Sequence, residues 1–376
     1  MSRALALARQ ALGITSPNPA VGAVLVRDGQ VVGEGYTQAP GEAHAEIMAL
    51  HQAGERARSA TLYVTLEPCS HQGRTPPCTS AIIAADVAEV HMALLDPNPL
   101  INGKGREELE AADISVTVGE QEEEAGQVNE AYLKFTRTGL PFIIAKYAAS
   151  LDGKIATRTG DARWITGVAA RRRANQLRAA SDAVMVGVGT VLADDPLLTA
   201  RDDQDHPLPH QPLRVIVDSS GRTPETARLF QEPGRVLIAG ARIPPRRAGA
   251  LKRAGAELLE LPAEDGSVDL RALMAALGKR QATAVLVEGG GGLLGSVLGQ
   301  ELADKLTVFL APVVIGGAEA VPAVGGVGSG TVAEALRLRE VTVEQVGEDL
   351  MVVGYPVKGA RQGRANQASG ADTVDP

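Results

Sequence analysis

The sequence predicts an α/β protein of two domains. The chain has 376 residues, which is more than one ordinary hydrophobic core requires. Apolar runs with strand character alternate with segments of helical periodicity along most of its length. The stretch Gly139-Leu140-Pro141 interrupts both patterns. We therefore expect a first domain over residues 1–139, a second over 140–358 and a disordered tail over 359–376.

The first domain is expected to form a sheet covered by helices. Asp28-Gly29 is a favoured pair for a tight hairpin turn and separates two β-rich runs. The opening residues have the pattern of an amphipathic helix and not of a signal peptide. The predicted strands are 20–26, 30–36, 61–65, 88–95 and 114–118, and the further predicted helices are 44–54, 79–85, 106–112 and 121–134.

The second domain repeats the alternation, without an internal sequence repeat. Short β-rich apolar runs are separated by helical segments, which is typical of a sheet with strands joined through helices. The predicted strands are 142–147, 183–187, 214–218, 235–239, 284–288 and 305–310, and the predicted helices are 171–180, 246–255, 270–278 and 293–300.

Composition excludes several classes of function. Hydrophobic residues make up 44% and charged residues 22% of the chain, as in ordinary globular proteins. A net charge of −8 argues against binding to nucleic acid or to an anionic membrane. The apolar runs are far shorter than the ~20 residues that span a bilayer. With no export signal, we expect a cytoplasmic protein, in which two cysteines point to a metal or to catalysis more than to a disulfide.

Four residues in the first domain form the ligand set and general base of a zinc deaminase. His44, Cys69 and Cys78 supply one imidazole and two thiolates, which leaves a fourth zinc position open for water. The metal lowers the pKa of that water to about 7. Glu46, two residues from the histidine, can then transfer its proton to the leaving amine. His-x-Glu followed by Pro-Cys is the signature of such enzymes, although in that signature two residues separate the two cysteines.

Local sequence supports these roles. His44 and Glu46 can share a target at the start of a helix, whereas in mid-helix they would point about 200° apart. Cys78 follows two prolines and precedes an apolar helical run, and a helix N-terminus stabilises a thiolate. Taken alone, His-x-Glu is usually a surface helix, and two separated cysteines are usually buried thiols. The three motifs His44-Ala45-Glu46, Pro68-Cys69 and Pro77-Cys78, present together and in this order, favour the metal site.

Longer motifs make the sequence similar to a known family. They are SPNP at 16–19, HAE at 44–46, LEPCSHQGRTPPC at 66–78, DPNP at 96–99, KYAASLDGKIAT at 146–157, GVGTVLADDPLLTAR at 187–201 and VEGGGGLLGS at 287–296. On these blocks the chain resembles the bifunctional riboflavin biosynthesis proteins, a pyrimidine deaminase fused to a ribosylamino-uracil reductase, from about residue 1 to about residue 357. The eight residues between the two cysteines are the most diagnostic part.

The resemblance implies both folds and both reactions. The first domain would be a cytidine-deaminase-like three-layer α/β/α domain with one Zn²⁺ per chain, and the second a dihydrofolate-reductase-like α/β domain that uses NADPH. The expected reactions are deamination of 2,5-diamino-6-(5-phosphoribosylamino)pyrimidin-4-one, then reduction of the ribosyl side chain to ribityl. The expected partners are phosphorylated pyrimidines, with no nucleic acid or membrane; a homo-oligomer stays open. Asn18 would contact substrate, although an Asn-Pro turn explains it equally well, and Asp96-Pro97-Asn98 could be only a strand-ending turn.

The signal in the second domain is weaker from the residues alone. A run of four glycines follows Glu288 between a predicted strand and a predicted helix, where phosphate could approach backbone N–H groups. It is not the dinucleotide-binding pattern of a Rossmann domain, and a plain glycine-rich turn remains an alternative.

The resemblance assigns roles to individual positions of the second domain. Lys146 and Asp194, with Glu288, would handle protons during the reduction. Arginines suit a substrate that carries a phosphate, although Arg178 could equally lie on the solvated face of an arginine-rich helix. Ala162 stands where the family commonly has serine, which leaves a backbone contact to the substrate. The implied cofactor contacts are Ala148, Trp164, Thr190, Asp194, Ser219, Gly290, Gly291, Gly292, Leu293, Leu294, Gly295 and Ser296, and the implied substrate contacts are Asn18, Ala162, Arg178, Leu198, Arg201 and Glu288.

Two other hypotheses compete with this one. A deaminase of nucleic acid or free nucleosides joined to a folate-type reductase is disfavoured by the acidic chain and the long spacer between the cysteines. A non-catalytic binding protein that keeps the fold is disfavoured because it would not require Glu46 beside the metal ligands.

Overall fold

The computed structural model describes residues 1–72, 76–264 and 266–359. By its contacts the chain divides into two compact units. The first holds Met1–Phe142 together with Leu277–Thr283, and the second holds Ile143–Ala276 and the chain from Ala284 onward. The predicted disordered tail, apart from Gly359, lies outside the described residues.

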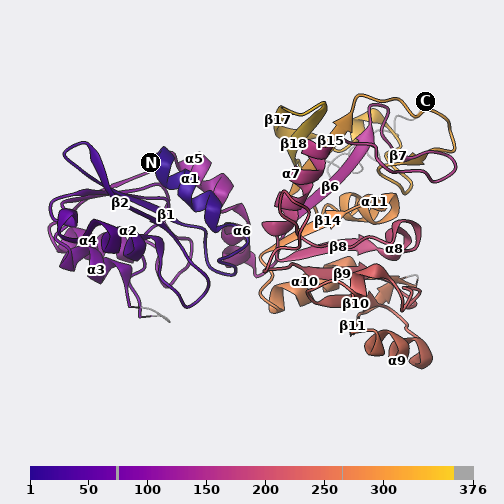
Figure 1. The fold of residues 1–376 in the computed structure, drawn as a ribbon, viewed down its shortest axis with the longest axis horizontal. Coiled ribbons are helices and arrows are strands. Elements are labelled where there is room, and N and C mark those ends of the chain that lie inside the picture. The colour runs from indigo at the N-terminus through magenta and orange to yellow at the C-terminus, as the bar shows by residue number, and fades with distance from the viewer. Residues whose placement is uncertain (73–75, 265, 360–376) are drawn as a thin grey trace, which may run out of the picture. The chain divides into compact units, whose positions relative to one another are not determined.

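The first unit is built on a mixed five-stranded sheet with the order β2-β1-β3-β4-β5. Figure 1 labels β1 and β2 of this sheet. The predicted hairpin is confirmed, because β1 pairs antiparallel with β2 across Asp28 and Gly29, whose φ angles of 52° and 74° suit a tight turn. β3 pairs antiparallel with β1, and β3, β4 and β5 run parallel. The strands are β1 Gly22–Arg27, β2 Gln30–Tyr36, β3 Thr61–Val64, β4 Glu89–Met92 and β5 Ser115–Val118.

Helices cover both faces of this sheet. On one face α1 (Ser2–Ala11) packs so closely that a Cβ at Gly22 would lie 1.9 Å from the Ala4 carbonyl oxygen. On the other face a Cβ at Gly35 would lie 2.4 Å from the Met48 Cβ. The predicted three-layer α/β/α arrangement is therefore confirmed. α5 (Glu122–Val128) joins α1, and the opposite layer consists of α2 (Ala45–Ala53), the short helix η1 (Gly54–Ala57), α3 (Cys78–Ala84) and α4 (Lys104–Ala111).

The single helix predicted over residues 121–134 is wrong. The structure has two helices, α5 and α6 (Glu130–Thr138), which meet at Asn129. The buried Asn129 carboxamide accepts a hydrogen bond from the Ala20 N–H at 2.9 Å and donates one to the Ala20 carbonyl at 3.0 Å. A side chain that bonds the backbone of a distant segment competes with helix continuation, and this contact is invisible in local periodicity.

The second unit contains a nine-stranded sheet with the order β11-β10-β9-β8-β14-β6-β15-β18-β17. All six predicted strands are present, whereas β11, β17 and β18 were not predicted. β17 pairs antiparallel with β18, and β18 with β15. The strands are β6 Phe142–Ser150, β8 Ala183–Gly187, β9 Leu213–Val217, β10 Val236–Gly240, β11 Ala256–Glu260, β14 Ala284–Glu288, β15 Lys305–Ala311, β17 Leu338–Val346 and β18 Asp349–Pro356.

The parallel strands of this unit direct their carboxyl ends to one edge. β9, β8 and β14 are parallel neighbours; α8 begins directly after β8, and α11 begins after the turn at Gly289 and Gly290 that follows β14. In open α/β sheets such an edge is where ligands bind. The remaining elements are α7 Val168–Ala179, α8 Val188–Asp194, α9 Pro245–Arg253, α10 Leu270–Lys279, α11 Gly291–Gly299, η2 Arg228–Phe230, η3 Val332–Glu334, β7 Lys154–Ala156, β12 Ala263–Glu264, β13 Ser267–Val268 and β16 Val321–Pro322. No helix in the described part of the chain is long and apolar enough to cross a membrane.

Candidate active sites

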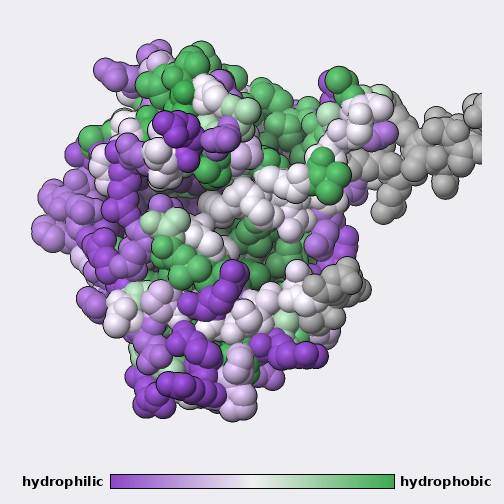
Figure 2. Space-filling view, turned by 90° about the vertical axis from the view of Figure 1, so that its right-hand side faces the viewer, coloured by the Kyte–Doolittle hydropathy of each residue, from purple (hydrophilic) through white to green (hydrophobic). Residues whose placement is uncertain are grey.

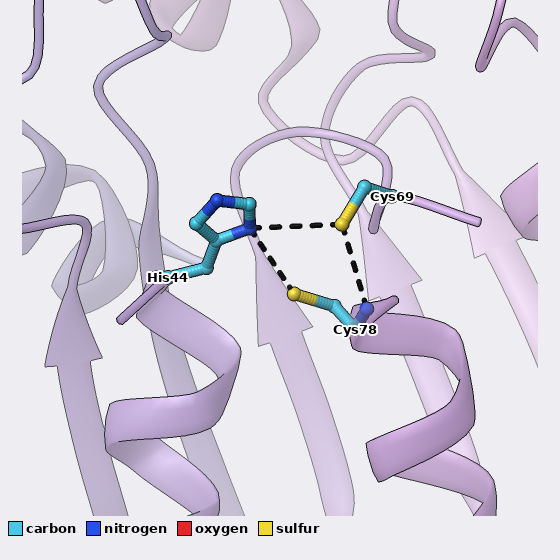
Figure 3. Close-up of side chains that lie close together, drawn as sticks. All are labelled: His44, Cys69 and Cys78. Carbon is cyan, nitrogen blue, oxygen red and sulfur yellow. Dashed lines mark hydrogen bonds between the residues drawn. The ribbon is translucent and has the colours of Figure 1, made fainter. Parts of the chain in front are cut away.

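The three predicted metal ligands converge in the first unit. His44 lies at the N-cap of α2, Cys69 in the loop after β3, and Cys78 at the first position of α3. The His44 Nδ1 atom is 3.6 Å from Cys69 Sγ and 3.3 Å from Cys78 Sγ, and the ligand atoms all lie within 4.8 Å of one another (Figure 3). One nitrogen and two sulfurs at such separations fit a catalytic zinc ion and leave a position for water.

The surroundings favour a thiolate at Cys69, whereas the hydrogen bond with Cys69, followed by burial, raises the pKa of the Cys78 thiol. Hydrogen bonds from the Cys78 side chain, then from the His44 ring and the Cys78 N–H, lower the pKa of the Cys69 thiol. The N–H of Cys78 lies 3.4 Å from Cys69 Sγ and belongs to the first turn of α3. The predicted placement of Cys78 at a helix start is confirmed.

Glu46 lies in the first turn of α2, beside His44, as the sequence predicted. The side chain is buried, and this burial, followed by the negative charge of Cys69, raises the pKa of Glu46 to about 7. A group with a pKa near the working pH exchanges protons most effectively in both directions. The geometry is therefore that of a general acid/base next to a metal centre.

A cavity of about 540 Å³ opens onto these residues. Asn18, the predicted substrate contact, lines it together with His44, Glu46 and Cys69. Sequence reasoning did not assign the other polar and aromatic residues of the wall, which are Thr37, Glu67, His71, Asp96, Asn98, Tyr132, Phe135, Thr136 and Gln281.

Asp96 and Asn98 form a turn and also belong to the cavity. The Asn98 N–H donates to Asp96 Oδ1 at 2.9 Å, which is the strand-ending turn that the sequence left open. The same two residues line the cavity. The Asp-Pro-Asn-Pro motif at 96–99 was the available signal, and a local turn alone does not reveal which side of the chain faces a ligand.

In the second unit the chain brings three charged residues together at β6, α7 and β14. Arg178 Nε and Nη2 donate to the two carboxylate oxygens of Glu288, each at 2.8 Å. Lys146 Nζ lies 3.9 Å from Glu288 Oε2. Arg178 therefore does not lie on the solvated face of an arginine-rich helix, and that alternative from the sequence is wrong.

Opposing effects set the charge states in this cluster. Burial lowers the pKa of Lys146. Burial alone would raise the pKa of Glu288, but the charges of Arg178 and Lys146 outweigh it and hold the pKa at about 2. Glu288 is thus an anion shared between two cations.

Arg201 is also engaged within the chain. Its Nη2 donates to Glu232 Oε2 at 2.9 Å and its Nε donates to Thr199 Oγ1 at 2.9 Å, while its side chain is 13% exposed. Leu198, another predicted substrate contact, is buried and has a φ of 57°. A phosphate on Arg201 would have to compete with Glu232.

The glycine run after Glu288 serves two purposes. Gly289 and Gly290 have φ angles of 74° and 76°, which other residues rarely adopt. Gly291 and Gly295 admit a neighbouring loop, since Cβ atoms there would lie 2.8 Å from the Pro322 and 2.1 Å from the Gly325 carbonyl oxygens. A Cβ at Gly292 would meet no atom within 4 Å, so this glycine leaves open space at the start of α11.

The other predicted cofactor positions differ in exposure. Trp164 is 70% exposed, and the Arg171 guanidinium lies 4.5 Å from the centre of its ring. Leu293 and Leu294 are buried, whereas Ser296 is exposed and donates to the Gly292 carbonyl at 3.0 Å. Figure 2 views the side of the molecule that lies at the right of Figure 1, where hydrophobic and near-neutral residues gather between hydrophilic margins.

The remaining predicted positions lie on three elements of the second unit and next to its glycine run. Ala148 lies on β6, Ser219 just beyond β9 and Asp194 at the end of α8. Thr190 borders the glycine run, because a Cβ at Gly290 would lie 3.0 Å from its Oγ1. Ala162 is half-buried in the loop before Trp164.

Comparison with known proteins identifies both domains. Residues 1–94 match the cytidine and deoxycytidylate deaminase zinc-binding region, and residues 141–352 match the RibD C-terminal domain. The riboflavin biosynthesis protein RibD of Aquifex aeolicus is 43% identical over 94% of this chain and 96% of its own. The solved structure of the Acinetobacter baumannii RibD (form 1) superposes with a TM-score of 0.84 at 39% identity, covering 95% of this chain and 98% of that one.

A further solved structure names both reactions. It is a diaminohydroxyphosphoribosylaminopyrimidine deaminase/5-amino-6-(5-phosphoribosylamino)uracil reductase from Thermotoga maritima, with a TM-score of 0.81 and 34% identity, covering 95% of this chain and 97% of that one. The predicted fold class and the predicted pairing of a deaminase with a reductase are thereby confirmed. The chain belongs to the RibD family of bifunctional deaminases and reductases of riboflavin biosynthesis.

Proposed function

We propose that the first unit hydrolyses 2,5-diamino-6-(5-phosphoribosylamino)pyrimidin-4-one to 5-amino-6-(5-phosphoribosylamino)uracil and ammonia. The observation that carries this proposal is the convergence of His44, Cys69 and Cys78 beside the buried Glu46. The reaction named for the Thermotoga maritima relative supports the choice of substrate. The cavity is lined by polar groups that suit a pyrimidine.

The residues divide the chemistry between them. A zinc ion held by His44, Cys69 and Cys78 would supply a Lewis acid that makes hydroxide available from water at neutral pH. Glu46 accepts the proton of the attacking water and returns it to the departing amine, so that a carbon–oxygen bond forms as the carbon–nitrogen bond breaks. Its pKa of about 7 suits both transfers.

We propose that the second unit reduces the ribosyl group of that product with NADPH. The positions predicted to hold the cofactor run from Ala148 on β6 through Ser219 beyond β9 to the glycine-rich first turns of α11. The open space at Gly292 fits close approach of a phosphate. NADPH would supply a hydride to C1′ of the opened ribose, with Lys146, Asp194 and Glu288 handling the protons.

We further propose a division at 139/140 and a cytoplasmic location. The thiol ligands support a reducing compartment, and the net charge of −8 supports small-molecule partners over nucleic acid or membrane.

A coupled assay tests both halves. The full chain, supplied with the diaminopyrimidine phosphate, should release ammonia and then oxidise NADPH, while NADH should serve poorly. Ammonia release from cytidine or deoxycytidylate but not from the diaminopyrimidine would overturn the substrate proposal. Equal rates with NADH would overturn the cofactor proposal alone.

A further inference from the structure

The Asp96 carboxylate belongs to the wall of the deaminase cavity, although it lies well away from the metal ligands in sequence. The residue follows β4 and is only 2% exposed. It lines the cavity with Glu46 and Cys69. A buried carboxylate beside a ligand cavity needs hydrogen-bond donors to stay in one orientation.

The backbone of Asp96 is fixed by Glu67. The Asp96 N–H donates to Glu67 Oε2 at 3.1 Å, and the same carboxylate accepts from the N–H groups of Gly103 at 3.0 Å and Arg106 at 3.2 Å. Because Glu67 stands two residues before the ligand Cys69, these bonds tie the segment 96–106 to the metal loop. The contact is close, since a Cβ at Gly105 would lie 2.2 Å from the Pro68 carbonyl oxygen.

The side chain of Asp96 is held from a different element. Tyr132, on α6, donates its hydroxyl to the carboxylate, with oxygen–oxygen distances of 2.9 Å to Oδ1 and 3.0 Å to Oδ2. Its ring packs against the hydrophobic core of the unit, which leaves the hydroxyl little freedom. Burial, then the nearby charges of Glu67 and Cys69, raise the pKa of Asp96, whereas the bonds from Asn98 and Tyr132 oppose that rise.

We propose that Tyr132 is a positioning residue of the deaminase, whose hydroxyl holds the Asp96 carboxylate so that it accepts hydrogen bonds from the amino and ring N–H groups of the pyrimidine. Tyr132 acts through Asp96 and not on the reacting atoms. The proposal rests on the diaminopyrimidine substrate proposed above. It assigns to α6 a part in substrate binding that none of the metal-binding motifs includes.

A purely structural role for the same bond makes different predictions. If the hydroxyl only fastens α6 to the segment after β4, its loss should lower thermal stability and disturb zinc binding and turnover together. If it positions Asp96, its loss should weaken substrate binding in a folded, zinc-loaded enzyme. The Michaelis constant and the turnover number therefore separate the two roles.

Tyr132→Phe in the full chain is the test, with Tyr63→Phe as the matched control. Tyr63 lies on β3, stacks on His91 at 4.8 Å and does not line the cavity. With ammonia release from the diaminopyrimidine phosphate as readout, Tyr132→Phe should raise KM about 10- to 150-fold, the value of a hydrogen bond to a charged group. The kcat should stay within a few-fold of wild type, and zinc content and reduction of supplied deaminated product should stay unchanged.

A double-mutant cycle locates the effect. In an Asp96→Asn background the hydroxyl meets only a neutral amide, so Tyr132→Phe should cost about 2- to 10-fold. An equal loss in both backgrounds, a Tyr132→Phe enzyme within twofold of wild type, or loss of zinc and stability in that variant would each overturn the proposal. Failure of the wild-type chain to deaminate this substrate would instead refute the proposed substrate.

Discussion

The two units differ in how far apart in sequence the residues of their sites lie. In the first, the metal ligands and Glu46 fall within residues 44–78 and sit at element starts or in a loop next to a strand. In the second, Lys146, Arg178 and Glu288 come from β6, α7 and β14. A compact motif fixes local backbone geometry and can be identified from sequence, whereas a site assembled from separate elements depends on tertiary packing.

The units differ in charge compensation as well. In the first unit the ligand atoms of His44, Cys69 and Cys78 lie within 4.8 Å of one another. Such a set of donors binds a metal cation. In the second unit the cations of the predicted site already have anions, Glu288 for Arg178 and Lys146, and Glu232 for Arg201. Removing a ligand from the first site should therefore affect metal and activity, while removing a charge from the second should also affect stability.

The largest expected effect follows from His44→Ala. The variant should lose bound zinc and all measurable deamination, because two thiols alone leave the coordination incomplete. His51→Ala is the matched control, since His51 is an exposed residue of the same helix. Metal analysis and ammonia release should show wild-type values for the control. If the His44→Ala variant retained its zinc, His44 would not be a zinc ligand.

Glu46→Gln should keep zinc but slow deamination by about 10²–10⁴-fold, the usual contribution of a positioned acid/base. The amide keeps the shape of the side chain and cannot accept the proton. Glu42→Gln, at an exposed residue before the helix, is the control. Near-normal turnover in Glu46→Gln would show that another group transfers the proton. Reduction of supplied deaminated substrate should be unchanged in both variants.

Sequence predicted the first site because each ligand was accompanied by a local signal. The Pro-Pro pair before Cys78 indicated a helix start, and the structure places Cys78 there. Tyr132 could not be found in this way. Its contact with Asp96 depends on a break in the helix at Asn129, which is imposed by a hydrogen-bonded partner at Ala20.

The second unit shows the same limit on a larger scale. Hydrophobic runs revealed its central strands, but β17 was missed because seven of its nine residues are exposed and its polar and charged side chains break the β-rich pattern. Composition also could not show that Arg201 pairs with Glu232 or that Arg178 pairs with Glu288. Such pairs join residues far apart in sequence.

Glu288→Gln should destabilise the second unit by about 3–5 kcal/mol, the cost of removing one partner from a buried ion pair. Urea unfolding followed by far-ultraviolet circular dichroism measures this change in the free energy of unfolding. Glu344→Gln removes the exposed partner of Arg173 and should cost less than about 1 kcal/mol. Equal effects of the two substitutions would contradict the buried role of Glu288.

The contribution of Glu288 to the stability of the second unit should decrease as the pH falls. In the folded state the charges of Arg178 and Lys146 depress the pKa of Glu288 from its ordinary value of 4.5 to about 2. Its stabilising contribution should therefore be complete above about pH 4.5 and lost as the pH falls toward 2. The difference in unfolding free energy between wild type and Glu288→Gln should shrink across that interval.

The smallest expected effect concerns Arg201. The family resemblance implies that it contacts the substrate, whereas the structure pairs it with Glu232. As a phosphate contact, Arg201→Ala should lower kcat/KM for the phosphorylated substrate of the reductase about 10- to 150-fold. The loss should vanish with a substrate that lacks phosphate. Steady-state NADPH oxidation with both substrates measures this.

The Glu232 carboxylate, 2.9 Å from Arg201, supplies the sharper control. If Arg201 binds phosphate, Glu232→Gln removes a competitor and should leave affinity for the phosphorylated substrate equal to wild type or higher. If the pair only supports the fold, both Arg201→Ala and Glu232→Gln should lower stability and reduce kcat/KM equally with and without phosphate. The second pattern would place Arg201 with the internally compensated charges of this unit and remove it from the substrate site.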